Sequence, residues 1–461
     1  MMLRRTDESS NGLQISQVIA AMSYALDMTE GQPQGHSARS CMIGMRLAYA
    51  LGLPEHEWPA LFYALLLKDL GCSSNASKVC YLFGADDRTA KGNLKTVDWS
   101  SRVRSLRYVS ENVAPEASAL QRARQFISVV AKGPAKAREL VQLRCDRGAT
   151  IARALLLPEA TAVAIRSLDE HWNGHGYPDN LEGEQIPVFS RILNLSQTVE
   201  VFWAQHGLEA ARQITIDRRG TWFDPAMVDA MDPIFNDEAF WGRMLKEDPI
   251  QEAMKLEPPQ QVLGSDDATL DRIAMGFSMV IDAKSPWTFC HSTGVAEVAV
   301  GIGVQLGFSM VELQQLNRAA LLHDVGKLGV SNLILDKPAK LDADELAEMR
   351  KHPSYTFDIL NRVDGFRQFS ELAASHHERL DGRGYHRGLP AEMLPKSVRV
   401  LAVADMYEAL AAKRPYRQDL SSEEVMTILN RDAGKGVCPE ALEGLKAFIA
   451  ESHFVPYRVA A

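Results

Sequence analysis

The chain contains an internal repeat, which constrains its fold more than any other feature. Residues 64–72 read "ALLLKDLGC" and residues 319–327 read "AALLHDVGK", 255 positions later. The loops "SLDEHWNGHGYP" at 167–178 and "SHHERLDGRGYH" at 375–386 are 208 positions apart. Two further pairs follow in the same order: "RILNLSQ" with "RVLAVAD", and "GTWFDP" with "GKGVCP". Four matched segments in one order predict two homologous domains in tandem.

The repeat also sets the expected domain boundaries. We expect a first domain over residues 13–245, a linker over 246–266 and a second domain over 267–455. The linker is rich in proline and acidic residues, which is typical of a boundary between domains. The two offsets differ by 47 residues, so the first domain should hold an insertion of that size between Cys72 and Arg144.

Apolar residues recur at helical spacing along most of the chain. "SARSCMIGMRLAYALGL" and "STGVAEVAVGIGVQLGF" both place them three and four positions apart and both end near a glycine. "DADELAEMRKHPSYTFDIL", residues 342–360, is expected as one amphipathic helical run in spite of Pro353. Alternation typical of strands is scarce, so the predicted fold class is all-α, with two helical domains.

Charge and cysteine usage restrict the classes of function. A net charge of -9 disfavours binding to nucleic acid polymers or to anionic membranes. The six cysteines are scattered without a C-x-x-C pair, which is typical of reduced thiols in a cytoplasmic protein. No apolar run approaches the roughly 20 residues of a membrane span. The N-terminal residues lack the apolar stretch of a signal peptide.

Six histidine and aspartate residues of the second copy are candidates for metal binding. They lie on four mostly apolar segments: His323, Asp324, His352, His376, His377 and Asp405. Burying such groups costs several kcal/mol unless they are paired or bound to metal. One His–Asp pair alone would more often be a structural hydrogen bond. Six such residues without cysteine instead suit iron, manganese, zinc or nickel and argue against a structural zinc site. Neighbouring helical residues differ by about 100° in direction, so Asp324 could bridge two metals.

These motifs resemble a known family. "HDVGK", "HHERLDGRGY" and a downstream "AD" are similar to the HD-GYP family, all-helical HD-superfamily phosphohydrolases that linearise cyclic di-GMP in bacteria. The match covers about Ala274 to Phe448. The resemblance implies that the six residues are metal ligands and that two divalent transition metals are bound, with iron or manganese favoured over zinc or nickel. It also implies that Lys327 contacts the scissile phosphate and that Tyr385, Arg414 and Arg417 hold guanine and phosphates.

The expected function is therefore hydrolysis of a cyclic dinucleotide, with cyclic di-GMP favoured and cyclic GMP-AMP open. Two metals about 3.5–4 Å apart, bridged by Asp324, can hold a hydroxide as nucleophile. Lys327 would stabilise charge on the phosphorane or on the leaving oxygen. One alternative is a non-catalytic effector that binds cyclic di-GMP and acts through protein contacts. Another is a different HD phosphohydrolase, such as a nucleotidase.

The second copy departs from the family pattern at two positions. His386 replaces the proline of Gly-Tyr-Pro, which predicts a looser loop with a solvated histidine. Trp287 stands where some members have a glutamate that binds a third metal. This second difference favours two metals and argues against His291 as a ligand.

The first copy has lost the candidate ligands. Asp69 remains, but the other positions hold Lys68, Arg144, Leu168, Asp169 and Gln197, and Cys72 replaces the lysine. We therefore expect catalysis only in the second domain, with Lys68 and Arg144 pairing with Asp69 or Asp169 where metals once lay. The first domain would either brace or dimerise the active one, or bind a regulatory ligand or a signalling protein.

Overall fold

The computed structural model describes residues 15–94, 97, 102–115, 117–259, 266–288, 290–412 and 420–452. Within these residues the chain forms helices and isolated β-bridges but no β-strand, so the all-α prediction is confirmed. Among the described residues, no helix combines the length and the hydrophobicity needed to cross a membrane.

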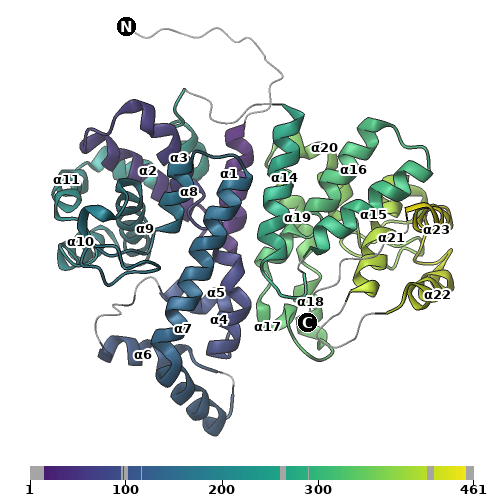
Figure 1. Cartoon of the computed structure of the whole chain (residues 1–461), viewed down its shortest axis with the longest axis horizontal. Helices are drawn as coiled ribbons and strands as arrows, with labels where there is room; N and C mark the ends of the chain where they lie inside the picture. Colours follow the sequence, from purple (N-terminus) through teal and green to yellow (C-terminus); the bar gives the residue numbers. More distant parts are fainter. Residues whose placement is uncertain are drawn as a thin grey trace.

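The helices gather in two halves that lie side by side (Figure 1). The first half contains α1 Ile15–Thr29, α2 His36–Ala50, η1 Glu55–Glu57, α3 Trp58–Leu66, η2 Cys72–Asn75, α4 Ala76–Phe83, α5 Asp87–Leu94, α6 Arg102–Asn112, α7 Ala119–Ala154, α8 Glu159–Arg166, η3 Gly183–Gln185, α9 Val188–His206, α10 Leu208–Asp217, α11 Pro225–Phe235, α12 Glu238–Met244 and α13 Pro249–Met254. The second half contains α14 Asp267–Asp282, α15 His291–Gln305, α16 Met310–Leu322, η4 Val325–Gly329, α17 Asn332–Leu335, α18 Ala343–Met349, α19 His352–Leu360, α20 Asp364–Ala374, η5 Ala391–Met393, α21 Lys396–Ala411, α22 Ser422–Asp432 and α23 Pro439–Ser452.

The repeated loops fold in the same way because they share a buried glutamate. Glu170 accepts hydrogen bonds from the backbone N–H groups of Asp179 and Leu181 at 2.6 and 3.0 Å. Glu378 accepts from the backbone of residues 387–389 at 2.7–3.0 Å. A Cβ on Gly384 would overlap the backbone of residues 377–379, so this position requires glycine. The residues common to both loops therefore hold the loop conformation.

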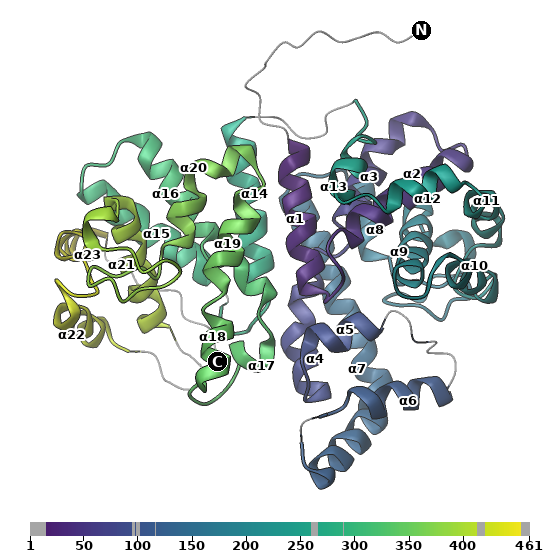
Figure 2. The same cartoon turned by 180° about the vertical axis from the view of Figure 1, so that it is seen from behind.

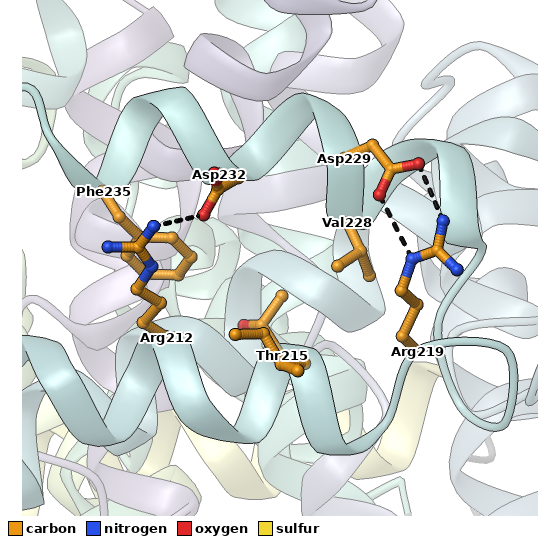
Figure 3. A pocket seen from close by; sticks show the side chains of 8 residues that line it. Arg212, Thr215, Arg219, Val228, Asp229, Asp232 and Phe235 are labelled. Atoms are coloured by element: carbon orange, nitrogen blue, oxygen red, sulfur yellow. Dashed lines mark hydrogen bonds and ion pairs between the residues drawn. The ribbon is translucent and has the colours of Figure 1, made fainter.

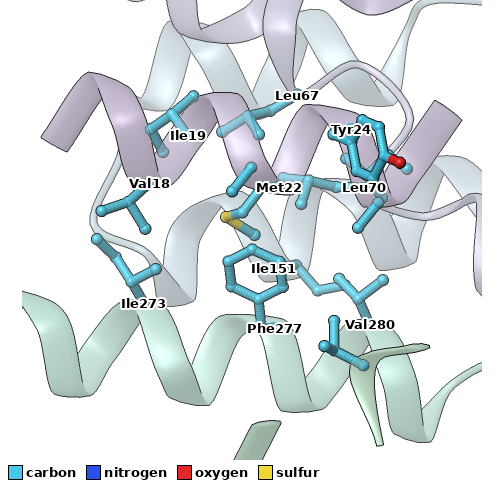
Figure 4. Packing of buried hydrophobic residues seen from close by; sticks show 14 of the residues in the cluster. Val18, Ile19, Met22, Tyr24, Leu67, Leu70, Ile151, Ile273, Phe277 and Val280 are labelled. Carbon is cyan, nitrogen blue, oxygen red and sulfur yellow. The ribbon is translucent and has the colours of Figure 1, made fainter. Parts of the chain in front are cut away.

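One hydrophobic cluster extends through both halves. The first helix of each half lies at the boundary: α1 packs on η4 and α19, and α14 packs on η2 and α7. Val18 and Met22 of α1 lie opposite Ile273 and Phe277 of α14 (Figure 4). All four side chains are at most 1% exposed. The two halves thus bury apolar surface against each other, which joins them into a single body.

The region of the first half that contains the expected insertion forms α4, α5, α6 and the N-terminal part of α7. Ser118 caps α7 through a capping box with Gln121, where the long helix begins. A second, smaller hydrophobic cluster that includes Phe83, Tyr108 and Val129 holds these helices together. As Figure 2 shows, α4 and α5 lie on the side of the first half that faces the second, and α4 contacts α17.

Two segments differ from the sequence-based expectation. Part of the expected linker is helical: α13 begins after Asp248, whose carboxylate accepts from two backbone N–H groups, and it packs on α2. The run at 342–360 is two helices, α18 and α19, and not one. Pro353 lies in the first turn of α19, where the missing N–H costs nothing because that group has no helical partner.

Candidate metal centre

The segment that carries His323, Asp324 and Lys327 does not form one continuous α-helix, although its spacing fits one. The α-helix ends at Leu322, and a 3-10 turn, η4, follows from Val325 to Gly329. A Cβ on Gly326 would overlap the carbonyl oxygen of His352, so α19 can approach this turn only at a glycine. Lys327 therefore reaches the centre from a 3-10 turn, and its Nζ lies 2.5 Å from Asp324 Oδ2.

Three imidazoles of the centre are oriented by the same local contact. Nδ1 of His323, His352 and His376 each donates to the carbonyl oxygen three residues earlier, at 2.7 Å in every case. In the neutral imidazole, a proton on Nδ1 leaves a lone pair on Nε2 that can bind a metal. A backbone carbonyl on the distal nitrogen is the usual way to fix a metal-binding histidine.

The two oxygens of Asp324 face different groups of histidines. Oδ1 lies 3.4 Å from His352 Nε2 and 3.7 Å from His376 Nε2. Oδ2 lies 3.3 Å from His323 Nε2 and 3.5 Å from His291 Nε2. One carboxylate thus stands between two clusters of nitrogen donors, as a bridging ligand would.

Asp405 and His377 complete the two clusters. Oδ1 of Asp405, on α21, lies 3.3 Å from His291 Nε2 and 3.7 Å from His323 Nε2. Oδ2 of Asp405 lies 3.8 Å from His377 Nδ1. The structure therefore brings together all six predicted residues.

The sequence argument disfavoured His291 as a ligand, yet the structure places this residue beside the centre. Its Nδ1 contacts Glu408, one turn after Asp405 on α21, and this contact directs Nε2 toward both aspartates. The residue is the first of α15 and is 2% exposed. The available signal was the repeat itself, because His36 and Glu200 form the same contact in the first half.

Burial and neighbouring charges separate the histidines into two electrostatic groups. Burial lowers the pKa of His352 to about 3 and that of His377 to about 4, so both are neutral donors near pH 7. Burial alone would also lower the pKa of His323, but the carboxylates of Asp324 and Asp405 raise it to about 9. The raised pKa of His323 reflects the negative charge of these carboxylates, which a bound cation could also neutralise.

The donors fit divalent metal ions. Nε2 of His323 and Oδ1 of Asp324 are fully buried without a hydrogen-bond partner, and both point into the centre. Such atoms are costly to bury unless a ligand satisfies them. Potential ligand atoms of His352, His376 and His377 lie within 4.8 Å of one another, and those of His291, His323 and Asp324 do the same. Imidazole with carboxylate is the donor set of transition-metal sites.

Two candidate substrate-binding groups lie beside the centre. The ring of Tyr385 is 4.6 Å from that of His377, measured between centroids. The guanidinium of Arg350, a residue that sequence analysis did not select, lies 5.2 Å from the Tyr385 ring. Arg414 and Arg417 lie outside the described residues.

His386 is not the solvated loop histidine that we expected. Its Nδ1 lies 2.9 Å from the hydroxyl of Ser354, and its ring packs near Phe357 at 6.2 Å between centroids. Both partners belong to α19, the helix that begins with His352. The histidine therefore restrains the loop through a contact with α19, whereas a proline would restrain the backbone of the loop directly.

Ion pairs occupy the corresponding place in the first half. Lys68 pairs with Asp69 and Arg144 pairs with Asp169, as predicted. Lys91, from the insertion, lies 3.4 Å from Glu30. Because a buried charge needs a partner, these cations take over the role of neutralising the carboxylates.

A pocket on the surface of the first half is unrelated to this chemistry. It has a volume of about 390 Å³ and lies between α10 and α11 (Figure 3). Its two arginines are each paired with an aspartate: Arg212 with Asp232 at 2.7 Å, and Arg219 with Asp229 at 2.8 Å. No lining residue belongs to the histidine cluster.

Comparison with known proteins decides the family. The model of the HD domain matches residues 134–227 and 276–438, which is more than half of the chain. The chain belongs to the HD domain family. This HD-domain protein carries the His323–Asp324 pair within the second matched segment, and the first matched segment covers the loop around Tyr177.

Several relatives of this HD-domain protein are named as cyclic dinucleotide phosphodiesterases. It is 42% identical to 3'3'-cGAMP-specific phosphodiesterase 3 of Vibrio cholerae over 95% of both chains. It is 33% identical to the cyclic di-GMP phosphodiesterase response regulator RpfG of Xanthomonas campestris, over 42% of this chain and 52% of the relative. The crystal structure of the V. cholerae enzyme V-cGAP3 superposes with a TM-score of 0.64 and 37% identity, covering 96% of this chain and all of that one.

Proposed function

We propose that this HD-domain protein is a metal-dependent phosphodiesterase that opens a 3'3'-linked cyclic dinucleotide. One observation carries the proposal: Asp324 stands between two clusters of buried imidazoles, with His323 and His291 on one oxygen and His352 and His376 on the other. Two-metal sites of this kind catalyse phosphate-ester hydrolysis. The relatives named as cyclic dinucleotide phosphodiesterases support the substrate class.

The chain's own residues divide into two sets of metal ligands. The first set would be His291, His323, Asp405 and Oδ2 of Asp324, and the second His352, His376, His377 and Oδ1 of Asp324. The donors suit iron or manganese, and zinc or nickel would also fit. When bound, the metals would supply Lewis acidity and a water of lowered pKa.

Other residues would bind and orient the substrate. Lys327 places its ammonium beside Asp324, where it can stabilise negative charge that develops on the phosphate. Tyr385 can stack on a base, a contact worth roughly 1–3 kcal/mol. Arg350, next to that ring, adds a fork-shaped donor for the second phosphate, together with Arg414 and Arg417.

We propose 3'3'-cyclic GMP-AMP as the preferred substrate. The sequence alone favoured cyclic di-GMP, but the relative that covers 95% of this chain is specific for 3'3'-cGAMP. The test is kcat/KM of the metal-loaded full chain on both cyclic dinucleotides, with Asp324→Ala as the inactive control. We expect at least a tenfold preference for the mixed dinucleotide. A preference for cyclic di-GMP would overturn this choice, and binding without hydrolysis would favour the non-catalytic effector.

Arg350, Arg414 and Arg417 separate the substrate class from general phosphodiester chemistry. Alanine at each position should reduce turnover of the cyclic dinucleotide about tenfold or more, a loss of about 1.4 kcal/mol in transition-state binding. Turnover of a simple aryl phosphodiester, which has no second phosphate, should change less than threefold. Equal losses on both substrates would mean that these arginines support the fold or the metals instead.

A further inference from the structure

Helix α5 of the first half contacts the segment that follows Lys327 in the second half. The Arg88 guanidinium donates from Nη1 to the carbonyl oxygen of Gly329. Oδ1 of Asp87 accepts from the backbone N–H of Asn332 at 2.9 Å. Gly329 ends η4 and Asn332 begins α17, so both contacts fall within five residues of Lys327. These two hydrogen bonds join α5 to the end of the turn that carries Lys327 and to the start of α17.

Asp87 also belongs to a buried polar cluster that crosses the boundary between the halves. Nζ of Lys284, just after α14, lies 3.5 Å from Asp87 Oδ2, and the two side chains are 2% and 0% exposed. The Asn332 side chain donates to the Lys284 carbonyl at 2.9 Å and to Asp336 at 2.7 Å. Loss of either partner of a buried ion pair strongly destabilises the folded protein, so this cluster holds α5 against the start of α17.

The turn that carries Lys327 is held from two sides. Before Lys327, the N–H of Gly326 donates to the Thr356 hydroxyl at 3.0 Å, and that hydroxyl donates to the His323 carbonyl at 2.8 Å. After Lys327, Arg88 and Asp87 of the first half hydrogen-bond the backbone of Gly329 and Asn332, and the Asp86 carboxylate forms a hydrogen bond with the Ser331 side chain. Displacements of about 1 Å at a reacting group can cost a hundredfold in rate.

The next turn of α5 contacts the ion-paired centre of the first half. Lys91 donates to the Cys72 carbonyl at 2.5 Å and lies 3.4 Å from Glu30. Asp86 holds the Arg88 side chain, with Nη2 at 3.2 Å from Oδ2. The short helix therefore connects the centre that lost its histidines with the turn that carries the catalytic lysine.

We propose that Asp87 and Arg88 are positioning residues for Lys327, through which the first half completes the catalytic site of the second. This inference rests on the proposed function only in the role given to Lys327. It assigns the inserted segment a task in catalysis, and it explains why the first half keeps its fold without its metal ligands.

The variants separate positioning from general stability. Arg88→Ala removes the donor to Gly329, and Arg88→Lys keeps a cation there. Asp87→Asn keeps an acceptor for the N–H of Asn332 but leaves Lys284 without its counter-charge. Arg191→Met is the matched control, because it breaks an ion pair of the first half, Arg191–Asp224 at 2.6 Å, that does not touch α5.

Kinetics of the metal-loaded full chain provide the first readout. Arg88→Ala should lower kcat five- to fiftyfold on both the cyclic dinucleotide and an aryl phosphodiester, with KM and metal content within twofold of wild type. Arg88→Lys should recover most of the loss, Asp87→Asn should lower kcat at least threefold, and Arg191→Met should stay within twofold. In a Lys327→Ala background, Arg88→Ala should add less than a twofold loss. Additive losses, or an equal loss in Arg191→Met, overturn the proposal.

Hydrogen exchange gives a readout that does not depend on any substrate. Peptides that cover residues 325–333 should exchange at least threefold faster in Arg88→Ala and Asp87→Asn than in wild type, and at the wild-type rate in Arg191→Met. Unchanged exchange in the first two variants refutes the positioning role. A wild-type protein that cleaves neither substrate refutes the proposed function, and the exchange rates then still decide whether α5 holds the turn.

Discussion

Nε2 of His291 lies 3.3 Å from Oδ1 of Asp405, while Nδ1 of the same ring contacts Glu408. The glutamate and the aspartate stand one turn apart on α21, so a single helix both orients the imidazole and supplies its neighbouring donor. Burial alone would lower the pKa of His291, but the Glu408 carboxylate raises it well above the ordinary value. In the absence of metal a proton neutralises this group, and a divalent ion would displace that proton.

We predict that His291→Ala lowers bound transition metal, although Trp287 argued against this ligand. The first half offers a matched control in His36, which makes the same buried contact with Glu200. His36→Ala should cost similar stability but leave the metal content unchanged. Elemental analysis of both purified variants, with thermal unfolding, checks this. Full metal occupancy in His291→Ala would show that His291 is not a ligand and has only a structural role.

We predict that Asp324→Ala and His377→Ala both lose metal and keep their helical fold. Asp324 faces both clusters and should lose both ions, whereas His377 faces one cluster and should lose one. Activity should fall by at least about a hundredfold in each variant, because the proposed hydrolysis depends on the metals that these residues would hold. His175→Ala, an exposed histidine in the equivalent loop of the first half, is the control. Elemental analysis measures the bound metal, and far-UV circular dichroism checks the helical fold. If a variant keeps its full metal content, the ligand assignment of that residue is wrong.

We predict that His171 makes stability fall as the pH drops below about 6.5. Burial, then the nearby charges of Arg218 and His175, lower its pKa to about 3, and Trp222 stacks on the ring. Between these values the unfolded chain binds a proton that the folded chain does not, so acid favours unfolding. The loss between pH 7.5 and pH 5 should be about 2 kcal/mol.

Urea unfolding at the two pH values measures this contribution. His171→Phe keeps the ring against Trp222 and removes the titration, so its stability should depend on pH by about 2 kcal/mol less than that of wild type. His56→Gln serves as the control, because the His56 side chain is 78% exposed. Identical pH dependence in wild type and His171→Phe would contradict the lowered pKa.

We predict that Phe277→Ala lowers the free energy of unfolding by about 3–5 kcal/mol. The side chain is 1% exposed and lies between α14 and α1, where a cavity would open in the cluster shared by both halves. Met275→Ala, on the same helix and 41% exposed, should cost less than about 1 kcal/mol. Chemical denaturation checks both. Two separate unfolding transitions, with only the second shifted by Phe277→Ala, would show that the halves unfold independently.

The sequence predicted the chemistry of the centre better than its geometry. Histidine and aspartate in apolar surroundings selected His323, Asp324 and His377 because buried polar groups need partners wherever the helices end. The helix boundary after Leu322 could not be read in the same way, since Asp324 and Lys327 fit a helical spacing as well as a 3-10 turn. The close approach of α19 to Gly326 decides between them, and it involves a residue 26 positions away.

The sequence by itself determined the all-α fold, the repeat, the ion pairs of the first half and a set of six residues that lie together in the second half. These features follow from local spacing, from residue types and from comparison of one copy with the other. Only the tertiary structure decided that Glu408 orients His291, that His386 binds Ser354, and that Asp87 and Arg88 reach the turn after Lys327. Such contacts join residues far apart in the chain, and they depend on how the two halves pack, which no periodicity in the sequence records.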